Sequence, residues 1–439
     1  MEYFSKKLFN SYLKIGKFSF LIGLFLLPSA ISVSIIFLLT SLIISFLDNF
    51  KKQFDDKINL IFLISCLLLL LSSIYNFFDK SSINNISNNS YLTFVGLLNW
   101  IPLIFAFIGF QKYLIDIRDR KMCIEVLILG SIPVLFSCFG QLLLNWYGPM
   151  KTLFGFITWY QRPIEGITGI TGLFNNPNYL AAWLNIIWPF CLVLIFFDKK
   201  DLIKNILKIS LIFSISLLII LASSRAGWVC LLIPLFFIYG SKIKIWIYSF
   251  LSLFSLIAIN LYFPIFGMRF QIFIQQLIPK GIWINFTDLE YENLDISRIG
   301  IWRYALKFIS ERPIWGHGSR SFTSLLLDDT GFWKGHSHNL PLELFVNYGL
   351  PAALFILLPI SYLLYKSFYK LYFKNYDSNK FDVLDRAWII SLTSLIFMHL
   401  VDIQYFDGRI SIAGWVLLAG IKNILLNDAN KNTNQILNS

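Results

Sequence analysis

The chain alternates between long apolar segments and short polar ones, and most apolar segments are long enough to cross a bilayer. A helix needs about 20 apolar residues to cross the hydrocarbon core. Residues 18–47 are too long for one such helix and are broken near Pro28, so they predict two short ones. Ten further segments qualify, at residues 58–77, 91–110, 123–146, 178–197, 206–223, 226–239, 245–266, 340–365, 387–403 and 410–425. The pattern predicts an all-α polytopic membrane protein with about twelve transmembrane helices.

The polar connections predict which way the chain crosses the membrane. Lys and Arg gather in short loops on the cytoplasmic side, whereas long loops are translocated largely regardless of charge. Of the 37 cations, 24 fall on one side, in seven mostly short loops and tails, and 13 fall on the other. Eight of these 13 lie in the long segment 267–339. We therefore expect both termini in the cytoplasm and residues 267–339 on the outer side.

Composition agrees with the predicted spans and changes the meaning of the net charge. Hydrophobic residues make up 56% of the chain and charged residues only 14%, whereas soluble domains carry nearer a quarter charged residues. So few charges cannot cover a soluble globule, which excludes soluble enzymes. A net charge of +12 would suggest nucleic acid binding in a soluble protein. Here membrane topology explains most cations, so we expect no nucleic acid partner. All five cysteines lie in or beside spans, which indicates core residues and no disulfide framework.

The order of spans and loops divides the chain into five expected parts. They are the first spans at 1–164, the central spans at 165–266, the outer loop at 267–339, the last spans at 340–425 and the tail at 426–439.

Arg225 lies in a turn of small residues, Ser223-Ser-Arg-Ala-Gly-Trp228, that joins two spans with almost no loop. In one interpretation, the side chain extends to the lipid headgroups and has no further role. In another, the small neighbours leave the guanidinium room for an anion, because ionisable groups at membrane depth are candidate sites. The residues alone leave both interpretations open.

The outer loop contains one amphipathic helical segment, which we expect to be capped near Asp295 or Ser297 and to stop before Pro313. At about 100° per residue, Arg303 and Lys307 fall on its polar face. Arg298 falls instead within the apolar stripe. The other members of the stripe would be Trp302, Ala305, Leu306 and Ile309. An arginine among apolar side chains needs a counter-charge or an anionic ligand.

Two of the four histidines lie in His336-Ser337-His338-Asn339, directly before a span. Histidines that only cap the helix are the simplest interpretation. A shared metal is a second, although no neighbouring cysteine or pair of acids completes a ligand set. A neutral imidazole that acts as a general base is a third, because its ordinary pKa suits proton transfer near neutrality.

The string Gly172-Leu-Phe-Asn-Asn-Pro-Asn-Tyr179 is typical of a turn that leads into a helix. Asn178 within it is a candidate contact for a substrate hydroxyl. Three further polar residues near the outer end of a later span could flank the same cavity; they are His399, Asp402 and Asp407.

Taken together and in this order, these strings resemble the O-antigen ligase and polymerase superfamily over about residues 165–425. The strings are Gly172–Asn178, Ser223–Trp228, Ser297-Arg-x-x-x-Trp302, Pro313-Ile-Trp-Gly-His-Gly-Ser319 and His338-Asn339. In the ligases of this superfamily, nine residues follow the His-Asn pair before a Gly-x-x motif. Gly349 fits that spacing, whereas Ala352 departs from the motif's last position.

The resemblance implies an inverting glycosyl transfer that uses no metal and no other cofactor. The donor would be a glycan linked to undecaprenyl diphosphate in the bacterial inner membrane. The acceptor would be a hydroxyl of lipid A core or a similar glycan at the periplasmic face. The resemblance implies that His338 is the catalytic base and that Arg225 and Arg298 bind the diphosphate. Further candidate substrate contacts are Asn178, Asn339 and His336.

Other functions remain open at this point. Within the superfamily, the chain could be an O-antigen polymerase or a protein O-oligosaccharyltransferase. Outside glycan transfer, an anion transporter for bicarbonate is an alternative, with the arginines along its path. The polar groups gather on one predicted face and no repeated half is evident, which favours transfer.

Overall fold

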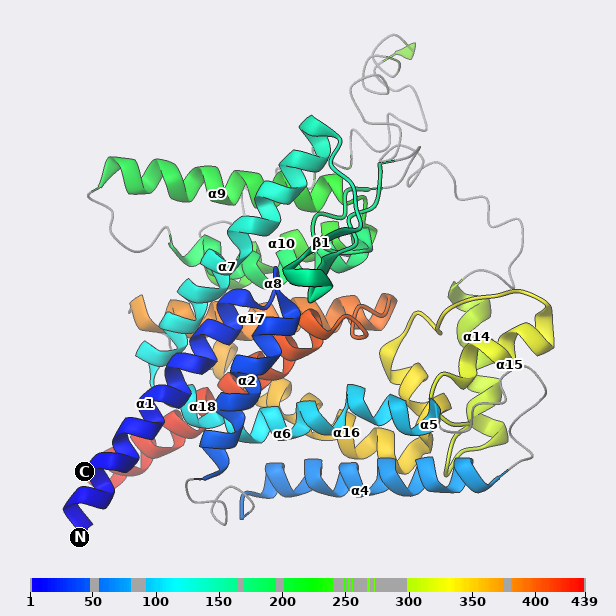
Figure 1. Cartoon of the computed structure of the whole chain (residues 1–439), viewed down its shortest axis with the longest axis horizontal. Coiled ribbons are helices and arrows are strands. Elements are labelled where there is room, and N and C mark those ends of the chain that lie inside the picture. Colours follow the sequence, from blue (N-terminus) through cyan, green and yellow to red (C-terminus); the bar gives the residue numbers. More distant parts are fainter. Residues whose placement is uncertain are drawn as a thin grey trace. The chain divides into compact units, whose positions relative to one another are not determined.

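The computed structural model describes residues 2–47, 55–79, 92–164, 169–194, 201–239, 298–373 and 380–437, with a few isolated positions between 248 and 272. Within these ranges the regular secondary structure is helical apart from one short hairpin (Figure 1). The all-α prediction is therefore confirmed there. The predicted span 245–266 lies outside the described residues apart from isolated positions, as does most of the outer loop before Arg298.

Eight helices among the described residues are long and apolar enough to cross a membrane, and two shorter apolar helices accompany them. The break predicted near Pro28 is present, because one helix ends at Leu26 and the next begins at Ile31. The longer helices are α1 Glu2–Leu26, α2 Ile31–Phe46, α4 Lys57–Phe78, α7 Ile117–Leu144, α8 Pro177–Leu194, α9 Leu202–Leu221, α10 Arg225–Tyr239, α16 Leu340–Phe373, α17 Lys380–Val401 and α18 Gly408–Leu437. The shorter ones are α5 Leu92–Val95, α6 Ile101–Phe110, α14 Arg298–Glu311 and α15 Ser321–Thr330.

The chain forms two compact units. The first unit contains residues 1–131, 292–381 and 395–439, and the second contains residues 132–291 and 382–394.

In the first unit, α16 packs along α4, α18 packs against α6, and α1 pairs with α2. A buried lysine joins three of these elements. Lys422 on α18 donates from Nζ to Asp56 Oδ1 at 2.7 Å, to Asn59 Oδ1 at 2.8 Å and to Gln111 Oε1 at 3.0 Å. All three ammonium donors have acceptors, so the charge is paired and satisfied in an otherwise apolar interior.

Helix α16 bends at Gly349, and the connection between α14 and α15 docks on this bend. The Leu350 N–H donates to the Pro313 carbonyl at 2.7 Å, and the Gly318 N–H donates to the Asn347 carbonyl at 3.0 Å. Gly349 has a φ of 78°, and a Cβ there would lie 2.1 Å from the Ile314 carbonyl oxygen. Only glycine fits this close approach.

In the second unit, α8 packs between α9 and α10. Small residues allow a tight contact, because a Cβ on Gly227 of α10 would lie only 3.0 Å from the Ala181 Cβ on α8. A short antiparallel hairpin follows α7. Its strands are β1 Met150–Thr152 and β2 Ile157–Trp159, with Met150 opposite Trp159.

Candidate functional site

The loop before α16 holds His338 in an unusual backbone conformation. Its φ is 53°, in the left-handed region that costs most residues about 1–2 kcal/mol. Hydrogen bonds on both sides stabilise this conformation. The Ser337 N–H donates to Glu343 Oε2 at 2.9 Å, and the Ser337 hydroxyl donates to the Asn339 carbonyl at 3.0 Å. A strained residue that its surroundings hold in place is often found at a functional site.

Asn339 connects this loop to two helices. Its Oδ1 accepts the Leu342 N–H at 3.0 Å, which caps the first turn of α16. Its Nδ2 donates to the Leu400 carbonyl at the end of α17 at 2.9 Å. Both polar atoms of the Asn339 amide are thus used within the protein, so the geometry gives this side chain a structural role beside the predicted substrate contact.

His338 forms a hydrogen-bonded pair with Asp402, which follows the end of α17. The distance between His338 Nδ1 and Asp402 Oδ1 is 2.8 Å. A carboxylate can only accept, so Nδ1 carries the proton and Nε2 presents its lone pair. The His338 side chain is 27% exposed, whereas the Asp402 side chain is 8% exposed. The imidazole can therefore meet a substrate while the carboxylate stays covered.

Asp402 remains ionised at neutral pH. Its burial raises the pKa of the carboxyl, but the hydrogen bond from His338 acts in the opposite direction, and the pKa of Asp402 lies below its ordinary value. The second carboxylate oxygen accepts from Gln404 Nε2 at 3.3 Å. This arrangement matches the base-and-orienting-acid geometry of many enzymes that take a proton from a hydroxyl.

His336 has a different role from His338. Its Nδ1 accepts the His338 N–H at 3.1 Å, so Nε2 carries the proton of the neutral ring. Burial, followed by the neighbouring His338 ring and the Arg298 guanidinium, lowers the pKa of His336 to about 4. His336 is therefore neutral near pH 7. The ring centroids of the two histidines lie 4.3 Å apart.

The same three side chains have metal-ligand chemistry. His336, His338 and Asp402 each offer one ligand atom, and these three atoms lie within 4.8 Å of one another. Zinc ligands of this type lie about 2.0–2.2 Å from the ion. In the described geometry, however, His338 Nδ1 is bonded to Asp402 and His336 Nδ1 is bonded to a peptide N–H. An ion would have to replace these bonds or use the Nε2 atoms.

Arg298 is the first residue of α14 and is partly buried. Its charge contributes to the low pKa of His336, which indicates that Arg298 lies near the histidine pair. The predicted helix end before Pro313 is confirmed, whereas the predicted cap at Asp295 or Ser297 lies outside the described residues. Arg303 and Lys307 are exposed, as expected. The buried stripe consists of Gly300, Ile301, Ala305 and Phe308.

One member of the expected stripe is displaced. Leu306 is 58% exposed, whereas Phe308 is only 1% exposed and packs in a cluster with Phe322 of α15 and Val346 of α16. The spacing of apolar residues along α14 is compatible with burial of either Leu306 or Phe308. The packing of α15 and α16 against α14 buries the face with Phe308. Arg298 consequently lies at the edge of the buried stripe rather than at its centre.

Arg225 and Asn178 belong to the second unit. Arg225 is exposed and begins α10, where the Ser224 hydroxyl accepts the Gly227 N–H at 3.4 Å. Asn178 is partly buried in the first turn of α8, and its N–H donates to Asn176 Oδ1 at 2.8 Å. Helices α8 and α10 pack together. The guanidinium thus lies at a helix N-terminus, which favours anions.

Of the other two polar residues predicted near this end of the span, His399 is linked to Asp402 through Gln404, and Asp407 pairs with Arg409. Asp407 is hydrogen-bonded to Arg409, at 2.9 Å from Nε. His399 is buried and contacts Gln404 at 3.3 Å. Sequence reasoning missed Glu343, which supports the Ser337 N–H. The signal that could have identified it is its position as an acidic residue in the first turn of a transmembrane helix.

A family model described as O-antigen ligase matches residues 209–357. The match covers roughly a third of the chain, and it begins within α9 and ends within α16, beyond Gly349. It includes Arg225, Arg298 and His338 and thus confirms the resemblance drawn from the sequence. Asn178 and Asp402 lie outside it. The comparison with curated proteins gives no match.

Proposed function

Because residues 209–357 match the O-antigen ligase family, we propose that the chain is a membrane glycosyltransferase of that kind. It transfers a glycan from an undecaprenyl diphosphate carrier to a hydroxyl of lipid A core or a similar acceptor. The His338–Asp402 pair is the observation that carries this proposal, since it prepares a proton acceptor with a defined lone pair.

In the proposed reaction, His338 Nε2 removes the proton of the acceptor hydroxyl. The freed oxygen lone pair forms a bond to the anomeric carbon from the face opposite the carrier. The bond between that carbon and the diphosphate oxygen breaks, and its electron pair leaves with the lipid diphosphate, so the anomeric configuration is inverted. Asp402 is the positioning residue, because it holds the ring and stabilises the imidazolium that forms.

The leaving diphosphate gains negative charge as the bond breaks. Arginine suits this charge, because its planar fork donates two parallel hydrogen bonds and never loses its proton. We assign this role to Arg298, near the histidine pair, and to Arg225, at the α10 N-terminus. Donors aimed at developing charge are each worth about a hundredfold or more in rate.

The proposal is tested in proteoliposomes that contain the purified chain, the lipid-linked glycan and lipid A core. We expect His338→Ala to abolish transfer without changing insertion, with Lys334→Ala as the matched control in the same loop. A chelator leaves the rate unchanged if the pair acts as a base without metal. Full activity of His338→Ala would refute the mechanism.

The acceptor can be identified in cells in which the gene for this chain is disrupted. Bare lipid A core together with long lipid-linked glycan indicates a ligase, whereas one repeat unit on the core indicates a polymerase. Undiminished glycan on lipid A core, with glycan lost from protein, indicates a protein O-oligosaccharyltransferase.

A further inference from the structure

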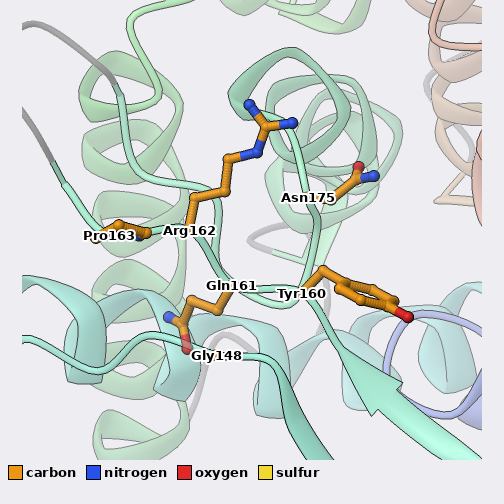
Figure 2. Close-up of a pocket in the computed structure, with 6 residues that line it drawn as sticks. All are labelled: Gly148, Tyr160, Gln161, Arg162, Pro163 and Asn175. Atoms are coloured by element: carbon orange, nitrogen blue, oxygen red, sulfur yellow. The ribbon is translucent and has the colours of Figure 1, made fainter.

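The second unit contains a pocket that the proposed transfer does not use (Figure 2). Its volume is about 260 Å³. It lies where the chain leaves the β1–β2 hairpin and approaches the turn before α8. Its walls are formed by Gly148, Tyr160, Gln161, Arg162, Pro163 and Asn175. The charge pattern predicts residues 146–177 on the outer side of the membrane, the same side as the loop that carries His338.

The pocket walls are tied together by a buried glutamine on α7. Gln141 is 1% exposed, and its Oε1 accepts the N–H groups of Thr171 at 3.0 Å and Gly172 at 2.9 Å. Its Nε2 donates to the Arg162 carbonyl at 2.6 Å. The Arg162 N–H in turn donates to Thr171 Oγ1 at 3.2 Å. The pocket is thus formed before any ligand binds, which reduces the entropy that binding costs.

One polar atom in the wall lacks a partner. Gln161 is 1% exposed, and its Nε2 donates to the Ser137 carbonyl at 2.9 Å. Its Oε1 is buried without a hydrogen-bond partner among the described residues. This oxygen is itself buried, so Gln161 forms part of the fixed wall, and the polar side chains that a ligand can reach are Arg162 and Asn175.

The open side of the pocket presents an aromatic ring beside two planar polar groups. Tyr160 is 58% exposed, and Arg162 and Asn175 are exposed as well. In Figure 2 the side chains of Arg162 and Asn175 extend on one side of the chain segment and that of Gln161 on the other. An exposed ring offers a flat apolar surface to the C–H face of a sugar. The guanidinium can donate to hydroxyl oxygens, and the amide can both donate to and accept from hydroxyls.

We propose that this pocket is a sugar-binding subsite that holds one hexose ring of a glycan. The ring stacks on Tyr160, and its hydroxyls bond to Arg162 and Asn175. The glycan itself is the substrate of the proposed function, so this inference rests on that function for its ligand. It gives the second unit a part in recognising the glycan.

The test measures binding of a lipid-free oligosaccharide, released from the surface glycan of the source cells by mild acid, to the full chain in detergent. Calorimetry gives the affinity, and saturation-transfer NMR identifies the sugar protons in contact. We expect Tyr160→Ala and Arg162→Ala each to weaken binding about tenfold or more. Tyr147→Ala and Lys151→Ala are the matched controls, because both side chains are exposed in the same segment and outside the pocket.

His338→Ala separates this inference from the proposed function. The subsite inference requires that this variant bind the oligosaccharide as the unmodified chain does, even if transfer is lost or unaffected. Equal binding by the chain, by Tyr160→Ala and by Arg162→Ala would overturn the subsite. Inorganic pyrophosphate is the second probe. If pyrophosphate binds in an Arg162-dependent manner and the oligosaccharide does not bind, the pocket is an anion site and the sugar inference is wrong.

Discussion

Asp402→Asn is the most informative single change in the candidate site. The substitution keeps the size and shape of the side chain and removes its charge. In the unmodified chain, Asp402 Oδ1 lies 2.8 Å from His338 Nδ1 and accepts a hydrogen bond from it. An asparagine can instead turn its amide N–H toward Nδ1, which moves the ring proton to Nε2. The ring would then have no lone pair directed at the acceptor hydroxyl.

The expected magnitude follows from the geometry of this pair. Two unit charges about 4 Å apart attract by about 4 kcal/mol at an effective dielectric constant of about 20. The His338 side chain is 27% exposed, so solvent reduces this to about 3 kcal/mol. The attraction exists only when the imidazole is charged, that is, as the proton is transferred. At about 1.4 kcal/mol per factor of ten, the rate should fall about a hundredfold, and the tautomer change should increase that loss.

The assay measures transfer in proteoliposomes at varied donor and acceptor concentrations. We expect kcat to fall about 10²–10³-fold in Asp402→Asn, with KM within about threefold of the unmodified value, because the change affects the transition state and not the bound substrate. Asp407→Asn is the matched control, since that carboxylate is bonded to Arg409. If Asp402→Asn retains more than about a tenth of the activity while Asp407→Asn is unchanged, the orienting role of Asp402 is refuted.

Three further predictions test the surroundings of the pair. Arg225→Ala and Arg298→Ala should each lower kcat about a hundredfold, whereas Arg303→Ala, on the exposed face of α14, should not; equal losses in the same transfer assay would contradict the assignment. Glu343→Ala should lower kcat at least tenfold with little change in KM and with rescue by Glu343→Gln, because the buried Ser337 N–H otherwise loses its acceptor; failure of the rescue would show that the charge of Glu343 is needed. The low pKa of His336 means that the unfolded chain binds its proton more tightly, so thermal stability should fall as pH drops from about 6.5 to 4, and an equal fall in His336→Gln would show that other groups cause it.

Much of the helical architecture was predictable from the sequence, because the hydropathy signal is local. The break between α1 and α2 follows from Pro28 and the excess length of one apolar run. The end of α14 follows from Pro313. Each of these depends on residues adjacent in the chain. The family match over residues 209–357 likewise agrees with short sequence motifs, each of which can be recognised from residues adjacent in the chain.

The contacts within the site were less predictable, because they depend on tertiary structure. Asp402 was one of three polar residues near the end of a span, and nothing in its local sequence distinguishes it from Asp407. The structure brings the end of α17 beside the 336–339 loop, and Asn339 fixes this contact through the Leu400 carbonyl. The same reason explains Leu306. The angular position of Leu306 on α14 was predicted correctly. The sequence of α14 does not determine, however, which side of the helix α15 and α16 cover.

The spacing between His338 and Gly349 has a structural explanation that the sequence motif alone lacks. The intervening residues form the first, straight part of α16, about 14 Å long at 1.5 Å per residue. One end of this part carries the histidine loop, and the other end is the bend on which the 313–318 connection docks through Leu350 and Asn347. That connection joins α14, whose first residue is Arg298. A fixed number of residues therefore fixes both the distance and the rotation between His338 and the helix that begins at Arg298. One inserted residue would turn the two by about 100°, which explains why the motif is defined by its length more than by its residues.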